Sequence, residues 1–172
     1  CPYCEINLPE LEPRSFSFNS PYGACPDCHG LGYLTILDEW GDVVLTDELC
    51  VSCGGSRLRK ESLAVKVNDR NIHELTNLSI NQMMGELSRW RFSPSQHRIA
   101  SPIRKEILSR LSVMDELGMS YLQLHRTTAS LSGGEARRLR LAAQVGARLR
   151  GVLYVLDEPT IGLHQRDNGR MI

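Results

Sequence analysis

The stretch Leu131-Ser132-Gly133-Gly134-Glu135 indicates the fold class and the chemistry of this protein more specifically than any other part of the sequence. Ser132 and Glu135 stand three residues apart ahead of an apolar-periodic run, which is typical of a capping box at a helix start. An ordinary capped helix does not explain the two glycines, because each costs about 1 kcal/mol of helix propensity. Glycines allow close approach to the free amides and the helix dipole, so the stretch predicts a helix that binds phosphate.

A buried strand ending in two carboxylates is predicted after that helix. The apolar run Val152-Leu-Tyr-Val-Leu156 is followed directly by Asp157 and Glu158. In open α/β folds, phosphates and magnesium bind at the carboxyl edge of the sheet, which makes Asp157 a candidate magnesium residue. Glu158 is then placed to orient or deprotonate an attacking water. Together the helix and the strand favour a nucleotide site.

Six cysteines lie in the first third of the chain as three Cys-x-x-Cys pairs. Structural zinc takes four thiolates, and a Cys-x-x-Cys knuckle supplies two of them from one tight turn. Without a secretion signal, metal ligation is favoured over a disulfide framework or a redox dithiol. The candidate zinc ligands are Cys1, Cys4, Cys25, Cys28, Cys50 and Cys53.

The spacing leaves open which four cysteines share a metal ion. The Cys25/Cys28 and Cys50/Cys53 pairs both have the form C-x-x-C-x-G, as in DnaJ-type zinc modules, and the glycine lets amides turn toward the sulfurs. The rival group of Cys1/Cys4 with Cys25/Cys28 has equally acceptable spacing. Six cysteines cannot fill two four-cysteine sites. The remaining pair would recruit His29 or another ligand, or stay metal-free, and an isolated histidine is more often a surface residue.

The middle of the chain carries strand, turn and helix patterns. Residues 62–72 predict a strand, a turn at Asn68-Asp69 and a returning strand. A capping box, Ser79 to Gln82, predicts a helix whose buried face carries Ile80, Met83, Met84, Leu87 and Trp90.

Two further helices are expected. After a polar stretch over 93–100, Ser101-Pro102 predicts a helix start and Gly118 its end. Its expected buried face is Ile103, Ile107, Leu111, Met114 and Leu117. The helix that begins at Ser132 is expected to end at Gly151. Its expected buried face is Leu139, Ala142, Ala143, Gly146 and Leu149.

The overall charge is balanced, with 20 basic and 20 acidic residues. Residues 126–150 hold six arginines and one acid, a segment that suits either a solvated helix face or phosphate groups. The longest apolar run is too short to span a bilayer, and the N-terminus has no signal-peptide pattern. We therefore expect a cytoplasmic protein without a membrane partner. The chain starts at Cys1 and stops just after a motif, so we expect an internal piece of a longer protein.

These motifs resemble the ABC ATPases. The stretch 131–135 is similar to the ABC signature, and Leu156-Asp-Glu-Pro-Thr-Ile-Gly-Leu163 looks like a Walker B strand running into a D-loop. Within that class the chain resembles the UvrA family nearly end to end, through residues 11–25, residues 53–58 and Gly162-Leu-His-Gln-Arg-Asp167.

The resemblance implies roles for individual residues. Ser132, Gly133, Gly134 and Glu135 would belong to the signature motif, which contacts the γ-phosphate of ATP held by an opposing half. Asp157 would lie near magnesium and Glu158 would be the catalytic carboxylate. His164 would lie in the D-loop region, where it either couples two ATP sites or is an ordinary surface histidine.

The resemblance also implies partners, and the sequence departs from the family in two places. The implied function is ATP-dependent recognition of damaged double-stranded DNA by a homodimer that loads a UvrB-like protein, with structural zinc and ATP with magnesium as cofactors. No G-x-x-x-x-G-K-[ST] loop occurs, so we expect the chain alone to be inactive. Few residues separate Cys28 from Cys50, where the family carries a large insertion.

The expected fold class is mixed α/β. Residues 1–58 would form the zinc-binding segment, 59–130 a mostly helical signature domain, and 131–172 part of an ABC ATPase core. Two alternatives remain: a UvrA-like paralogue for drug self-resistance that acts without UvrB, and a non-enzymatic zinc-binding interaction module.

Overall fold

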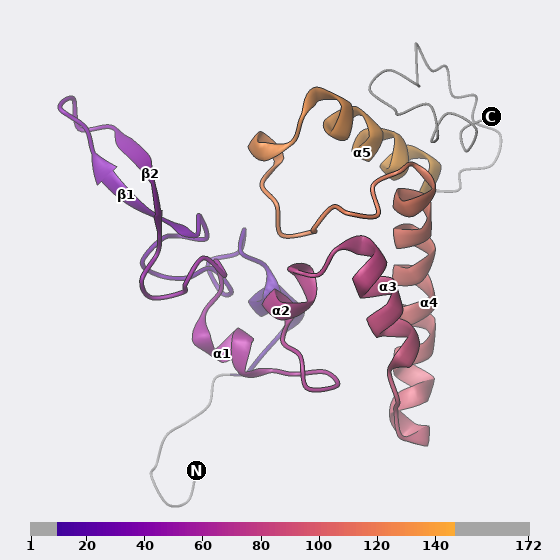
Figure 1. Ribbon diagram of the computed structural model, residues 1–172. Coiled ribbons are helices and arrows are strands. Elements are labelled where there is room, and N and C mark those ends of the chain that lie inside the picture. The colour runs from indigo at the N-terminus through magenta and orange to yellow at the C-terminus, as the bar shows by residue number, and fades with distance from the viewer. Residues whose placement is uncertain (1–9, 147–172) are drawn as a thin grey trace, which may run out of the picture. The chain divides into compact units, whose positions relative to one another are not determined.

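The computed structural model describes residues 10–146 of the chain, and these fall into two compact units. The first unit runs through Cys1–His73 and the second through Glu74–Ile172. The described residues combine one small sheet with several helices, which confirms the mixed α/β class at that level (Figure 1). The expected ATPase strand at 152–156 and the helix end at Gly151 lie outside the described residues.

The first unit consists of loops, a hairpin and short helices. A 3₁₀ helix, η1 (Pro13–Phe16), precedes strands β1 (Tyr33–Leu37) and β2 (Val43–Leu49), and helix α1 (Lys60–Ala64) follows. Helix α2 (Ile72–Thr76) lies at the boundary between the two units. Strands β1 and β2 pair antiparallel, with Thr35 opposite Leu45 and Ile36 opposite Val44. This hairpin was not predicted from the sequence, although its runs of β-branched residues favour strands.

The hairpin turn is held by one carboxylate. Oδ1 of Asp38 accepts hydrogen bonds from the amides of Trp40 (2.9 Å) and Asp42 (2.8 Å). Gly41 has a φ of 83°, a left-handed conformation that glycine adopts without steric cost. Trp40 is therefore presented at the apex with 83% of its surface exposed.

The predicted strand at the start of 62–72 is wrong. Residues 60–64 form helix α1, and only an isolated bridge joins Val67 to Arg70. The turn between them is confirmed, because Asn68 and Asp69 both have positive φ. The hydroxyl of Ser62 donates a hydrogen bond to the carbonyl of Ser15, and Ser62 is almost fully buried. This long-range contact outweighs the local alternation of apolar residues.

The second unit is built around helices α3 (Ile80–Arg89), α4 (Pro94–Glu116) and α5 (Gly133–Gly146), with a short 3₁₀ helix, η2 (Thr128–Ser130), before α5. Helix α3 packs beside α4, and α5 packs against α4 near its C-terminal end (Figure 1). The core of this unit comprises Ile80, Met83, Leu87, Leu111, Met114, Leu117, Met119, Leu122, Leu141 and Ala142.

Helix α3 is the helix that the capping box at Ser79 predicts. Ser79 is the N-cap, and its side chain and that of Gln82 make both bonds of the capping box. Ile80, Met83 and Leu87 are buried, while Met84 and Trp90 are partly buried against the same core.

The predicted start of α4 is wrong. The helix begins at Pro94, with Ser93 as N-cap and Gln96 completing a capping box, so Pro102 lies inside the helix. The stretch judged to be polar loop thus carries its own cap and first-turn proline. Because the helix starts early, its N-terminal half runs past the core. Ile103 is 56% exposed and Ile107 37%, against the prediction.

The end of α4 agrees with expectation. Leu111, Met114 and Leu117 are buried, as predicted. Gly118 has a φ of 73° just after the last helical turn, which is the usual place for a glycine stop. Within residues 10–146, no helix is both long and apolar enough to cross a membrane.

Candidate metal centre and signature helix

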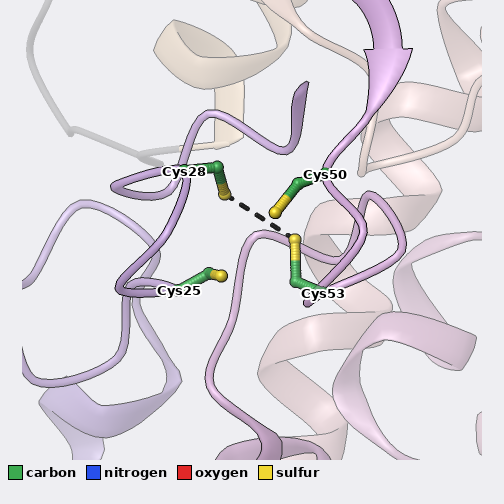
Figure 2. A group of neighbouring side chains, drawn as sticks. All are labelled: Cys25, Cys28, Cys50 and Cys53. Carbon is green, nitrogen blue, oxygen red and sulfur yellow. Dashed lines mark hydrogen bonds between the residues drawn. The ribbon is translucent and has the colours of Figure 1, made fainter. Parts of the chain in front are cut away.

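Four of the six cysteines meet in the first unit. The sulfur atoms of Cys25, Cys28, Cys50 and Cys53 all lie within 4.8 Å of one another (Figure 2). The sulfurs of Cys28 and Cys53 lie 3.7 Å apart. Cys25, Cys28 and Cys50 are buried and Cys53 is half-buried. Four converging thiols at this spacing match the donor set of a tetrahedral structural zinc site.

The backbone joins the two knuckles reciprocally. The amide of Cys25 donates to the carbonyl of Arg57 beyond the second knuckle (2.8 Å), and the amide of Cys50 donates to Gly32 beyond the first (3.0 Å). The amide of Gly32 also donates to the sulfur of Cys28 (3.2 Å). Each knuckle is therefore fixed by the residues that follow the other one, which brings distant cysteines together.

Glycine geometry lets the first knuckle turn tightly. Gly30 has a φ of 83°, and a Cβ added there would clash with the carbonyl oxygen of Phe18. Gly55 of the second knuckle also has a φ of 83°. The glycine in the shared C-x-x-C-x-G form thus serves a left-handed turn in both knuckles, beside the Phe18 backbone at Gly30 and beside the Leu49 side chain at Gly55.

The pKa values of Cys25, Cys50 and Cys53 are shifted by their surroundings. Burial, together with the neighbouring Cys28 thiol, raises the pKa of Cys53 to about 12. Burial also raises the pKa of Cys25. For Cys50 burial opposes ionisation, but hydrogen bonds from the amides of Cys53 and Ser52 and from two thiols lower its pKa. A cation among these sulfurs would stabilise all the thiolates, because metal binding displaces their protons.

The structure brings together the two pairs that share the C-x-x-C-x-G form. Cys1 and Cys4 lie outside the described residues. His29 has a φ of 50° and is exposed, and the four-cysteine group does not include it.

Residues 131–135 lead into helix α5 as predicted. Oε2 of Glu135 accepts a hydrogen bond from the amide of Ser132 (2.8 Å), and the hydroxyl of Ser132 accepts one from the amide of Glu135 (3.3 Å). A Cβ added at Gly133 would meet no atom within 4 Å. Packing among the described residues therefore does not require glycine at 133, and the first turn is open to a ligand.

The buried face of α5 differs in part from the prediction. Ala142 is buried and Leu139 packs against the core, as expected. Ala143 is exposed, however, and the buried Leu141 was not predicted. Leu149 lies outside the described residues, as do Asp157, Glu158 and His164.

Three side chains that sequence reasoning missed surround Glu135. The hydroxyl of Tyr121 donates to Oε1 of Glu135 (2.8 Å), and Nη1 of Arg126 lies 3.5 Å from the same oxygen. Nη2 of the buried Arg138 lies 3.5 Å from the Tyr121 hydroxyl. The hydrogen bond from the Ser132 amide lowers the pKa of Glu135 most, and the Tyr121 hydroxyl adds to this. Tyr121 precedes Glu135 by 14 residues, so no local pattern indicates the contact.

The site and fold define a class of protein in which paired C-x-x-C knuckles accompany a glycine-started, capped helix. No family model matches the sequence. UvrABC system protein A from Listeria monocytogenes is 33% identical over the whole chain, and the Bacillus subtilis protein of that name is 31% identical. The crystal structure of UvrA2 from Deinococcus radiodurans is similar with a TM-score of 0.72, 31% identity and coverage of 94% of this chain and 18% of that chain.

Over its whole length the chain is similar to UvrA proteins. It spans 29% of the length of the curated relatives named above. The match to the Listeria protein extends over 277 residues whereas this chain has 172, so the relative contains residues that this chain lacks. This agrees with a shortened insertion, whose place between Cys28 and Cys50 stays a prediction.

Proposed function

We propose that the chain is part of an ATP-dependent protein that recognises damaged double-stranded DNA in nucleotide excision repair. One observation carries this proposal: the chain matches UvrA proteins over its whole length and contains both the four-cysteine centre and the capped signature helix. The complete protein would act in the cytoplasm as a homodimer with a UvrB-like partner.

The signature helix supplies one side of the proposed ATP site. The amides of Gly133 and Gly134 lie in the first turn of α5, where helix geometry leaves amides without intrahelical partners. These amides and the Ser132 hydroxyl would bind the γ-phosphate of ATP held by an opposing half. Asp157 would hold magnesium and Glu158 would orient or deprotonate the attacking water. His164 would lie between paired sites.

Zinc would have a structural role. Cys25, Cys28, Cys50 and Cys53 would hold it, and it would cross-link two knuckles in a unit whose described buried apolar residues are few. Cys1 and Cys4 remain candidate ligands of a second site.

The hairpin is poorly suited to bind DNA phosphates. Its residues include five carboxylates and no lysine or arginine: Asp38, Glu39, Asp42, Asp47 and Glu48. Repulsion between these groups and phosphate would oppose binding there. Contacts to the DNA backbone would instead use exposed basic side chains such as Arg98 and Lys105 on α4.

Single-turnover ATP hydrolysis by the full-length protein, with its other ATP site silenced, tests the nucleotide role. Glu158→Gln keeps the shape of the side chain but removes its basicity. Hydrolysis should then fall at least about 100-fold, while ATP affinity changes little. Asp157→Asn should also weaken magnesium-dependent nucleotide binding. Parental hydrolysis by Glu158→Gln would show that the carboxylate is not catalytic.

A second candidate is a UvrA-like paralogue that works without UvrB, for example in drug self-resistance. The residues present in the Listeria relative but absent here favour it, because a shortened chain lacks surface that the relative offers. Binding of the full-length protein to purified UvrB separates the two functions. Stable complex formation supports the repair role, and its absence supports the paralogue.

A further inference from the structure

We propose that Tyr121 and Arg126 are positioning residues for ATP hydrolysis, which hold the Glu135 carboxylate back so that the first turn of α5 can accept a phosphate. Neither residue belongs to the signature stretch. The proposal rests on the proposed ATP site and adds to it a specific control over the signature helix.

The Glu135 carboxylate presents an electrostatic problem at this position. It lies in the first turn of the helix that would meet the γ-phosphate, and two negative groups at close range repel one another. Glu135 is only 8% exposed, so water screens its charge poorly. Its pKa is lowered, chiefly by the hydrogen bond from the Ser132 amide, so it is ionised at neutral pH.

Tyr121 supplies a hydrogen-bond donor to the Glu135 carboxylate, and Arg126 supplies a positive charge beside it. Oε2 of Glu135 accepts from the Ser132 amide, and Oε1 accepts from the Tyr121 hydroxyl, both at 2.8 Å. The Arg126 guanidinium lies 3.5 Å from Oε1 and offsets the charge. With both oxygens held, the carboxylate cannot rotate toward a ligand over Gly133. Hydrogen bonds to an ionised group are stronger than those between neutral groups, so the orientation of the Glu135 carboxylate is well fixed.

Arg126 also holds the chain immediately before the signature stretch. Its Nη2 donates to the carbonyl of Ser130 (2.6 Å) and its Nε to the Ser130 hydroxyl (3.3 Å). One side chain therefore fixes both the approach to the helix and the carboxylate in its first turn.

Tyr121 and Arg126 lie on one strap, residues 119–126, whose other side is bound to the start of α3. The amides of Ile80 and Asn81 donate to the carbonyls of Leu122 (2.9 Å) and Ser120 (3.0 Å). Met119 and Leu122 are buried in the core, which anchors the strap. The strap therefore holds Tyr121 beside Glu135.

The test uses the full-length protein with its other ATP site silenced. Tyr121→Phe removes only the hydroxyl and should lower kcat roughly tenfold, the scale of one lost hydrogen bond to a charged group, while KM for ATP stays unchanged and the protein stays folded by circular dichroism. Tyr22→Phe, an exposed tyrosine in the first unit, is the matched control and should leave kcat unchanged. Arg126→Lys should lose less activity than Arg126→Ala, because it keeps the positive charge.

A double-mutant comparison separates positioning from general stability. In a Glu135→Gln background the charge is gone, so adding Tyr121→Phe should change kcat by less than about twofold. Parental kcat in Tyr121→Phe, or losses that multiply in the double variant, would overturn the positioning role. If Tyr121→Phe unfolds, the Arg126→Lys and Arg126→Ala pair decides the matter. Parental hydrolysis by Glu158→Gln would instead overturn the proposed ATP site itself.

Discussion

Cys28 and Cys53 lie with their sulfur atoms 3.7 Å apart, although 25 residues separate them in the chain. The contact joins the knuckle before the hairpin to the knuckle after it (Figure 2). Two thiols this close, with two more within 4.8 Å, form a site that a metal ion would fill. The β1–β2 hairpin, which lies between the two knuckles in the chain, would then extend from a pair of knuckles that the metal ion cross-links.

We predict that Cys50→Ser removes zinc and unfolds the first unit, whereas Cys4→Ser leaves this centre loaded. Cys50 is one of the four clustered ligands, and structural zinc contributes folding free energy directly. Metal analysis of protein purified without added metal should give one to two zinc ions per chain, by the ligand count of a four-cysteine site. Circular dichroism before and after chelation would report unfolding.

The rival grouping gives the opposite result. If Cys1 and Cys4 share zinc with Cys25 and Cys28, then Cys4→Ser loses the metal and Cys50→Ser retains it. A metal-free preparation with intact structure would contradict any structural zinc.

We predict that Leu87→Ala and Ile103→Ala differ sharply in stability, although the sequence pattern treats both positions as buried. Leu87 is 2% exposed in the core of the second unit, and its truncation should cost about 2–5 kcal/mol. Ile103 is 56% exposed on α4, so its truncation should change the free energy of unfolding by less than about 0.5 kcal/mol. Urea unfolding measures both. A loss of similar size at both positions would contradict the early start of α4.

We predict that acid weakens the start of α5 through Glu135. Its pKa is lowered from its ordinary value of 4.5, mainly by the Ser132 amide and then by Tyr121. A lowered pKa in the folded state stabilises the protein above the unfolded value, and this stabilisation disappears as pH falls through the folded value. Unfolding measured from pH 7 down to pH 3 should therefore show a smaller loss of stability in Glu135→Gln than in the parent. Identical pH profiles would mean that Glu135 is not held as described.

Local signals explain what the sequence predicted well. The caps at Ser79 and Ser132 depend on residues three positions away, and both form as expected. The stop at Gly118 depends on one backbone conformation, which glycine adopts readily. The Cys-x-x-Cys spacing likewise predicted ligand pairs.

Long-range contacts explain what the sequence could not give. Nothing local shows whether Cys50/Cys53 or Cys1/Cys4 is the partner of the Cys25/Cys28 knuckle; within residues 10–146, reciprocal backbone bonds from Cys25 and Cys50 bring Cys50/Cys53 to it. The contact of Tyr121 with Glu135 arises only when the strap folds against α5. Two other features were not predicted although local sequence signals indicated them. Ser93-Pro94 was a readable helix start, and the hairpin strands had β-branched runs on both sides of a turn.

The most direct test of the account compares binding of the full-length protein to two duplexes at one fixed salt concentration, one intact and one with a single bulky lesion. Dissociation constants should be measured with ATP for the parent and for Glu158→Gln. The account predicts that the parent prefers the lesion-bearing duplex when ATP is present, and that Glu158→Gln, which accumulates with ATP bound, has an altered preference. Equal affinity for both duplexes, unaffected by ATP or by Glu158→Gln, would contradict it.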